Sequence, residues 1–217
     1  MTNAKKNTPN KANKTSTYHH GDLQSSLLTT ATAMITEQGI EALSLRKLAE
    51  RIGVSRTAAY HYFKNKNDLL VAIAAQGFIS WQSQAEQIFA NKQLSDKAKY
   101  QNFVHYYVQF ATQNAAIYKL MFGSTLWKKT PTKGESSPQA LIDVAYPSFQ
   151  YQVEMTQKWQ QKGILPQTSS SLRLAQVTWA TLHGIAQLVI DGIYADDSQI
   201  DEMCQCAVDL FLAESRQ

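Results

Sequence analysis

Residues 44–66 read SLRKLAERIGVSRTAAYHYFKNK, and this stretch decides how the rest of the chain is interpreted. Its first half carries apolar residues three and four positions apart, the spacing of a short helix buried on one face: Leu45, Leu48, Ala49 and Ile52. Gly53 then interrupts the pattern, and Ser55 can cap a second helix by accepting a hydrogen bond from its free backbone N–H groups. The stretch therefore predicts two short helices joined at a glycine turn.

The second of these helices is expected to run to about Phe63, with Ala59 and Phe63 facing inward. Two helices joined in this way form either an ordinary αα-hairpin or a helix-turn-helix, whose second helix lies in the DNA major groove. The small Ala49 suits a close helix crossing, and the second helix starts with cationic and hydroxylated residues. Both features favour the helix-turn-helix, so we expect this stretch to bind DNA.

The predicted DNA contacts lie at and around the start of the second helix. We expect Arg56, Thr57 and Ala58 to read bases. The expected phosphate contacts are Ser44, Tyr60, His61 and Lys66, and the helix cap Ser55 completes the DNA-binding set.

The same stretch resembles the DNA-binding signature of the tetracycline-repressor (TetR) family. The residues that carry the resemblance are Leu48-Ala49, Gly53-Val54-Ser55, Thr57, Tyr60, His61-Tyr62-Phe63, Lys66 and Leu69-Leu70. One departure is Asn67, where the family usually has an acidic residue. The resemblance implies a homodimeric repressor that binds a palindromic operator on double-stranded DNA. It also implies a small-molecule effector that moves the predicted 68–90 helix, changes the distance between the two DNA-binding domains of the dimer and so releases the DNA.

The charge distribution agrees with a DNA-binding N-terminal end. The 217-residue chain has a net charge of +4, yet residues 1–70 carry ten basic and five acidic side chains and the remainder carries eleven and twelve. A solvated basic surface would give the same excess, but its coincidence with the helix-turn-helix favours a polyanion. No apolar run reaches the length of a membrane span and no signal-peptide core is present, so we expect a cytoplasmic protein.

We expect an all-α chain of about nine helices in three parts. Residues 1–17 are polar, with four lysines and no acidic residue, and are expected to be disordered; this arm either reaches into a DNA minor groove or is an inert tail. Residues 18–70 are expected to form the three-helix DNA-binding domain. Residues 71–217 are expected to form a helical domain for ligand binding and dimerisation.

Aromatic residues are concentrated in the predicted C-terminal domain. They either fill a core or line a pocket, and their attachment to a DNA reader favours a pocket for a mostly apolar molecule of modest size. The predicted lining residues are Phe103, Tyr107, Phe110, Met121, Phe122, Trp159, Trp179 and His183. The run Trp179, His183, Gly184 also resembles the Trp-His-Gly signature of one TetR subgroup.

The last two predicted helices, residues 172–190 and 200–213, are too apolar for one face of each to be solvated. We expect them to form a four-helix bundle across a two-fold axis, the commonest way to bury such a face. The predicted interface residues are Leu174, Thr181, Gly184, Ile185, Val189, Met203, Ala207 and Leu210.

Two other functions stay open from the sequence. A DNA-binding adaptor with a protein partner would keep the helix-turn-helix but would have no cavity near Trp159 and Trp179. An enzyme would use the aromatic cavity around His183 and would need a carboxylate or thiol beside that residue; a buried histidine that is hydrogen-bonded for packing is the simpler interpretation. There is no phosphate-binding glycine loop and no GxSxG motif, and only two cysteines are present. We therefore expect no catalytic residue, no cofactor and no metal.

Overall fold

The computed structural model describes residues 20–124, 126–127, 139–194 and 199–212, so the predicted arm at residues 1–17 lies outside the described residues. Over these residues the chain is all-helical, as predicted, with nine α-helices, one 3₁₀ turn and no strand. The helices are α1 (His20–Gln38), η1 (Ile40–Ala42), α2 (Leu45–Ile52), α3 (Arg56–Tyr62), α4 (Lys66–Ala90), α5 (Asp96–Gln113), α6 (Ala115–Phe122), α7 (Gln139–Gln161), α8 (Ser171–Ile190) and α9 (Ile200–Phe211).

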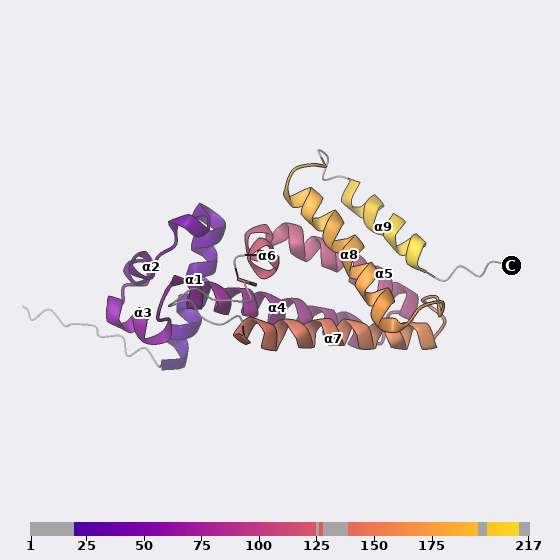
Figure 1. Cartoon of the computed structure of the whole chain (residues 1–217), viewed down its shortest axis with the longest axis horizontal. Coiled ribbons are helices and arrows are strands. Elements are labelled where there is room, and N and C mark those ends of the chain that lie inside the picture. Colours follow the sequence, from indigo (N-terminus) through magenta and orange to yellow (C-terminus); the bar gives the residue numbers. More distant parts are fainter. Residues whose placement is uncertain (1–19, 125, 128–138, 195–198, 213–217) are drawn as a thin grey trace, which may run out of the picture.

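The first three α-helices form a head at one end of the molecule, with α2 and α3 in the predicted helix-turn-helix arrangement (Figure 1). The hydroxyl of Ser44 accepts a hydrogen bond from the backbone N–H of Lys47 at 3.2 Å and caps α2. Ser55 caps α3 in the same way, as the sequence predicts, by accepting from the N–H of Ala58 at 3.2 Å. Gly53 ends α2 with a φ of 80°, a left-handed conformation that glycine adopts without steric cost.

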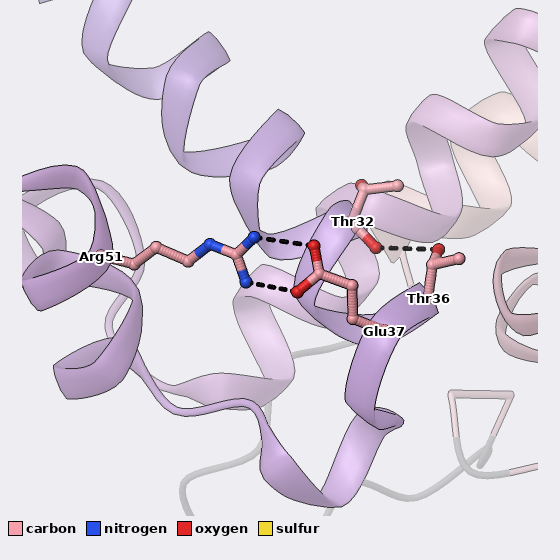
Figure 2. Close-up of polar contacts among 4 residues, drawn as sticks. All are labelled: Thr32, Thr36, Glu37 and Arg51. Atoms are coloured by element: carbon pink, nitrogen blue, oxygen red, sulfur yellow. Dashed lines mark hydrogen bonds and ion pairs between the residues drawn. The ribbon is translucent and has the colours of Figure 1, made fainter.

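A bidentate ion pair links α1 to α2 in the head. Two guanidinium nitrogens of Arg51 donate to the two carboxylate oxygens of Glu37 at 2.6 and 2.7 Å (Figure 2). The hydrogen bonds from Arg51 lower the pKa of the Glu37 carboxyl. Because both side chains are open to solvent, which screens their attraction, we assign the pair a role in orienting the two helices rather than in stability.

Helix α4 leaves the head and runs into the C-terminal part of the molecule (Figure 1). It starts at Lys66, two residues before the predicted start, because the side-chain oxygen of Asn65 caps it by accepting from the N–H of Asp68 at 2.9 Å. The apolar core of the head continues along this helix beyond residue 70, through Phe78, to Ile117 of α6. The head and the C-terminal part are therefore packed together through α4 and α6.

A second apolar cluster lies further along the C-terminal part, where α5 packs against α8 and α9. Its largest buried side chains include Tyr100, Phe103 and Trp159. Helix α7 lies alongside α4 (Figure 1). None of the described helices is long and apolar enough to cross a membrane.

Candidate DNA-reading helix and effector cavity

The exposed surface of α3 carries four of the eight side chains that the sequence assigns to DNA contact. Arg56 and Thr57 are exposed at the start of the helix, and His61 is exposed near its end. Tyr60 is 50% exposed although it is a large aromatic residue. Arg56 belongs to none of the ion pairs found within the described ranges, so its guanidinium can bind a base or a phosphate.

Of the remaining predicted DNA contacts, Ser55 is exposed and the other three are half-buried. Ala58 is half-buried and packs against the core of the head, so it presents less surface to a base than Arg56 does. Lys66 is half-buried in the first turn of α4. The hydroxyl oxygens of Ser44 and Ser55 already accept backbone hydrogen bonds, which leaves the hydroxyl hydrogens to donate to phosphate.

A cavity of about 470 Å³ lies between the helices of the C-terminal part. Its walls come from α4, α5, α6, α7 and α8, together with Trp127. The lining residues are Phe78, Trp81, Tyr107, Tyr118, Met121, Phe122, Trp127, Ala145, Tyr146, Ser148, Phe149, Gln152, Gln176 and Trp179. No Asp, Glu, Lys, Arg or His occurs among these residues, so the part of the wall that the structure describes carries no formal charge at neutral pH.

Four of the eight predicted ligand contacts line this cavity: Tyr107, Met121, Phe122 and Trp179. Phe103 and Trp159 do not, because they are fully buried against each other in the second cluster. Phe110 packs beside Tyr106 on α5 and also lies outside the cavity lining.

The last predicted contact, His183, is not among the lining residues, but a chain of hydrogen bonds connects it to Tyr107, Tyr118 and Trp179, which are. The Trp179 indole N–H donates to the Tyr107 hydroxyl at 2.8 Å. The hydroxyls of Tyr107 and Tyr118 lie 2.9 Å apart, and the Tyr118 hydroxyl lies 2.6 Å from Nδ1 of His183. An indole N–H can only donate, so every hydroxyl hydrogen has an acceptor if Tyr107 donates to Tyr118 and Tyr118 donates to His183.

Burial determines which groups of this hydrogen-bond chain carry a proton. Desolvation raises the pKa of Tyr107 well above its usual value and raises the pKa of Tyr118. Desolvation lowers the pKa of His183, so the imidazole is neutral at pH 7 and its Nδ1 can accept. The chain of hydrogen bonds therefore connects α5, α6 and α8, and none of its four side chains carries a formal charge. The ring contacts of His183 are with Tyr118, Phe122 and Trp179, and none of these described neighbours carries the carboxylate or thiol that the enzyme alternative needs.

The sequence reasoning missed the polar part of the wall, which comes from α7. Ser148 and Gln152 are each 3% exposed and line the cavity, and Thr156, one turn further along, is equally buried. Their spacing of four residues places them on one helix face. This spacing was the signal that the sequence offered, because it marks a line of polar side chains along a helix face that is otherwise apolar.

The predicted dimer residues differ in burial, from buried through half-buried to exposed. Ala207 is 3% exposed and packs in the second cluster of its own chain, so the prediction that it contacts a partner is corrected. Leu174 and Ile185 are half-buried against the same cluster. Leu210 is 76% exposed. The half-buried remainder is Thr181, Gly184, Val189 and Met203.

Two residues that the sequence reasoning left out, Val177 and Leu188, expose an apolar side chain on α8. Together with Thr181 and Gly184 they are spaced four, three and four residues apart, which places all of them on one helix face. A Cβ atom added at Gly184 would meet nothing within 4 Å in its own chain. We call Val177, Thr181, Gly184 and Leu188 the α8 face.

Residues 27–73 match the family described as "Bacterial regulatory proteins, tetR family", and residues 100–211 match the family described as "Tetracyclin repressor-like, C-terminal domain". The second match alone spans about half of the chain. The chain therefore belongs to the TetR family, whose members are DNA-binding transcriptional regulators and not enzymes, and the predicted class is confirmed.

Individual relatives resemble the chain over different lengths. The tetracycline repressor protein class C of Escherichia coli is 46% identical over 48 residues, which is 22% of this chain and 22% of that repressor, so the chain matches only about a fifth of the curated relative. A solved protein of unknown function from Rhodococcus sp. RHA1 is 30% identical over 92% of this chain and 100% of its own, with a TM-score of 0.76. The TetR regulator PfmR of Thermus thermophilus is 18% identical over 88% and 99% of the two chains, and its TM-score of 0.63 supports the fold alone.

Proposed function

We propose that the protein is a homodimeric repressor that binds a palindromic operator and is released from it by a small, mostly apolar effector. The observation that carries this proposal is that α4 belongs both to the head and to the cavity. Leu69 and Leu70 pack in the core of the head, whereas Phe78 and Trp81 further along the same helix line the cavity. A ligand that displaces α4 therefore displaces the head.

Helix α6 supplies a second connection between the cavity and the head. Tyr118, Met121 and Phe122 line the cavity, and Ile117 and Leu120 pack in the cluster that contains the core of the head. The helix also contacts α1 directly. Packed interiors transmit displacement because they have little free volume, so a shift of α6 reaches α1.

Release requires that the effector bind the DNA-free arrangement more tightly than the DNA-bound one. A hundredfold difference corresponds to about 2.7 kcal/mol of coupling free energy. An apolar ligand can supply that difference through buried area, at roughly 25 cal/mol per Å², if the cavity changes shape between the two arrangements.

Dimerisation is proposed to use the α8 face together with α9. The exposed fractions of Val177 and Leu188 are 55% and 37%, and Leu210 of α9 is 76% exposed. Pairing these helices with the same helices of a second copy would cover the apolar surface and set the distance between two heads, as a palindromic operator requires.

We also propose that the chain belongs to the subgroup with the Trp-His-Gly signature. Trp179 and His183 bind the two ends of the Tyr107–Tyr118 pair, which gives the first two signature residues a shared role in positioning α8 against α5 and α6. Such a repressor acts in the cytoplasm, where the operator lies, and the basic arm at residues 1–17 is proposed to strengthen DNA binding.

The adaptor alternative has less support, because the discriminating feature, a cavity at Trp179, is present. The test of the proposed function measures operator affinity and cavity binding on the same protein. An operator selected from random DNA would be titrated by fluorescence anisotropy with and without hydrophobic and aromatic compounds, while tryptophan fluorescence reports cavity binding.

We expect some compounds to quench the tryptophans and also to release the operator. The Trp179→Ala substitution should abolish that response and preserve operator affinity. Compounds that quench the tryptophans but leave operator affinity unchanged would contradict the coupling and favour the adaptor.

A further inference from the structure

Three tryptophans line the cavity, and only two of their indole N–H groups have an acceptor. Trp127 donates to the backbone carbonyl of Met121 at 2.7 Å, and Trp179 donates to the Tyr107 hydroxyl at 2.8 Å. The Nε1 atom of Trp81 is buried and has no hydrogen-bond partner among the residues that the structure describes. This donor stands out because the other two indoles in the same wall are satisfied.

The glutamines of the wall show the same excess of donors. The amide nitrogen of Gln152 is buried and likewise has no partner within the described part of the chain. In Gln176 the carbonyl oxygen accepts from Arg173 at 2.8 Å, so its acceptor is already engaged. Ser148 donates its hydroxyl hydrogen to Gln82 or to the carbonyl of Val144, at 2.8 and 2.9 Å.

Unpaired buried donors are costly, because each has lost its hydrogen bond to water and gained none in exchange. Trp81 is 7% exposed and Gln152 is 3% exposed, so solvent does not satisfy them. They come from α4 and α7, two helices that pack side by side along the cavity. A hydrogen-bond acceptor on a ligand would supply the partner that each of these donors lacks.

We infer that the effector carries a neutral hydrogen-bond acceptor, a carbonyl-type oxygen on an apolar or aromatic frame, and that Trp81 and Gln152 donate to it. This inference rests on the proposed function, because it names the chemistry of the effector of the same cavity. A carboxylate would also accept, but none of the described residues that line the cavity is cationic and could offset its loss of hydration. The end torsion of a glutamine is broad, so the Gln152 amide can turn its N–H toward the ligand.

The test uses two probes that differ only at the bridging group: benzophenone, whose two rings are joined by a carbonyl, and diphenylmethane, whose rings are joined by a CH₂ group. Dissociation constants for the full chain without DNA are measured by isothermal titration calorimetry. Because the two probes partition differently from water, the readout is the change in the ratio of their dissociation constants between variants. Diphenylacetate serves as the charged probe and is expected to bind more weakly than either.

Trp81→Phe and Gln152→Leu each remove one donor and keep an apolar side chain. The double variant is expected to lower the preference for benzophenone over diphenylmethane roughly tenfold, the effect of one or two net hydrogen bonds. Retained binding of diphenylmethane shows that the variant is folded and keeps its cavity. Trp127→Phe is the matched control, because it removes an indole N–H that already has an acceptor; it should leave the ratio of the two constants as it is.

A second measurement shows which helices lie next to the carbonyl group of bound benzophenone. Irradiated benzophenone takes a hydrogen atom from a nearby C–H bond onto its oxygen and then joins its carbonyl carbon to that carbon. We expect the labelled peptides of the wild-type chain to come from α4 and α7.

The outcomes separate this inference from the proposed function. A ratio that stays the same in the double variant, or labels confined to other helices, would overturn the inference even if both probes release the operator. A ratio that shifts tenfold while neither probe changes operator affinity would support the inference and contradict the effector role.

Discussion

A Cβ atom added to Gly77 of α4 would lie 2.7 Å from the sulfur and 3.0 Å from Cγ of Met121 in α6. The two helices therefore cross at a point where only a hydrogen atom fits. Met121 lines the cavity, and Gly77 lies in the helix that begins in the head. This contact joins the wall of the cavity directly to the helix that is proposed to move the head.

The first prediction is that Gly77→Ala separates α4 from α6. Ile117, at 3.1 Å from the same added atom, leaves the methyl group little room, so we expect the free energy of unfolding to fall by about 1–3 kcal/mol, the usual cost of overpacking. We also expect effectors to change operator affinity less than in the wild type. Urea unfolding and anisotropy titration measure the two effects. Gln76→Ala, an exposed position on the same helix, is the control and should change stability by no more than about 0.5 kcal/mol.

The second prediction separates base reading from phosphate binding in the head. Arg56→Ala should lower discrimination at one base pair by about 1–3 kcal/mol, because the side chain is exposed and unpaired at the start of α3. Lys66→Ala should weaken binding to all sequences alike and reduce the salt slope by about 1. Anisotropy titrations on operators with single base-pair changes, at several salt concentrations, distinguish the two.

Lys158→Ala removes the same charge from an exposed site on α7 and should leave both quantities unchanged. The base-reading assignment would be wrong if Arg56→Ala preferred the same operator sequence as the wild type to the same degree.

The head could be predicted in detail because its signals are local. The apolar spacing of α2, the Ser55 cap and the Gly53 turn each act within a few residues, and the structure has all three. The cavity could be predicted only in part. Helical periodicity places Phe103 and Tyr107 on the same inward face of α5, but it does not say which neighbours each will meet. Phe103 meets Trp159 in a packed cluster, whereas Tyr107 lies one turn nearer to the cavity.

The polar part of the cavity wall and the dimer surface were harder to predict from the sequence, for a related reason. A glutamine such as Gln152 is usually exposed, so composition alone assigns it to solvent. Ala207 and Leu210 both belong to the apolar pattern of α9, but Ala207 packs in the second apolar cluster of its own chain and Leu210 faces outward. Which apolar face of a helix is covered by its own chain depends on contacts between distant segments, which periodicity does not contain.

The third prediction concerns pH. An unfolded histidine binds a proton with a pKa near 6.5, whereas burial lowers the pKa of His183 in the folded chain. Between these two values the unfolded state binds more protons, so the free energy of unfolding should be highest above pH 6.5 and fall as the pH drops below it. Protonation of His183 also turns Nδ1 into a donor, so Tyr118 loses its acceptor.

Urea unfolding at pH 7.5, 6.5 and 5.5 measures this dependence. His183→Gln cannot titrate, so its stability should fall less over that range. An identical fall in the wild type and in His183→Gln would show that other groups cause it.

The last prediction tests the subunit interface. Val177 and Leu188 are exposed on the α8 face, with Gly184 between them leaving open space for a neighbouring helix. Substituting both Val177→Arg and Leu188→Arg places two cations on the α8 face of each copy, where like charges would meet across the two-fold axis. We expect this variant to sediment as a monomer at micromolar concentration while the wild type sediments as a dimer. Operator affinity should then fall, because one head reaches only one half-site. Ile79→Arg changes an equally exposed apolar residue on α4 and should remain dimeric. If the wild type itself sediments as a monomer, or if the double variant stays a dimer, the two copies do not pair through α8 and the palindromic operator loses its structural basis.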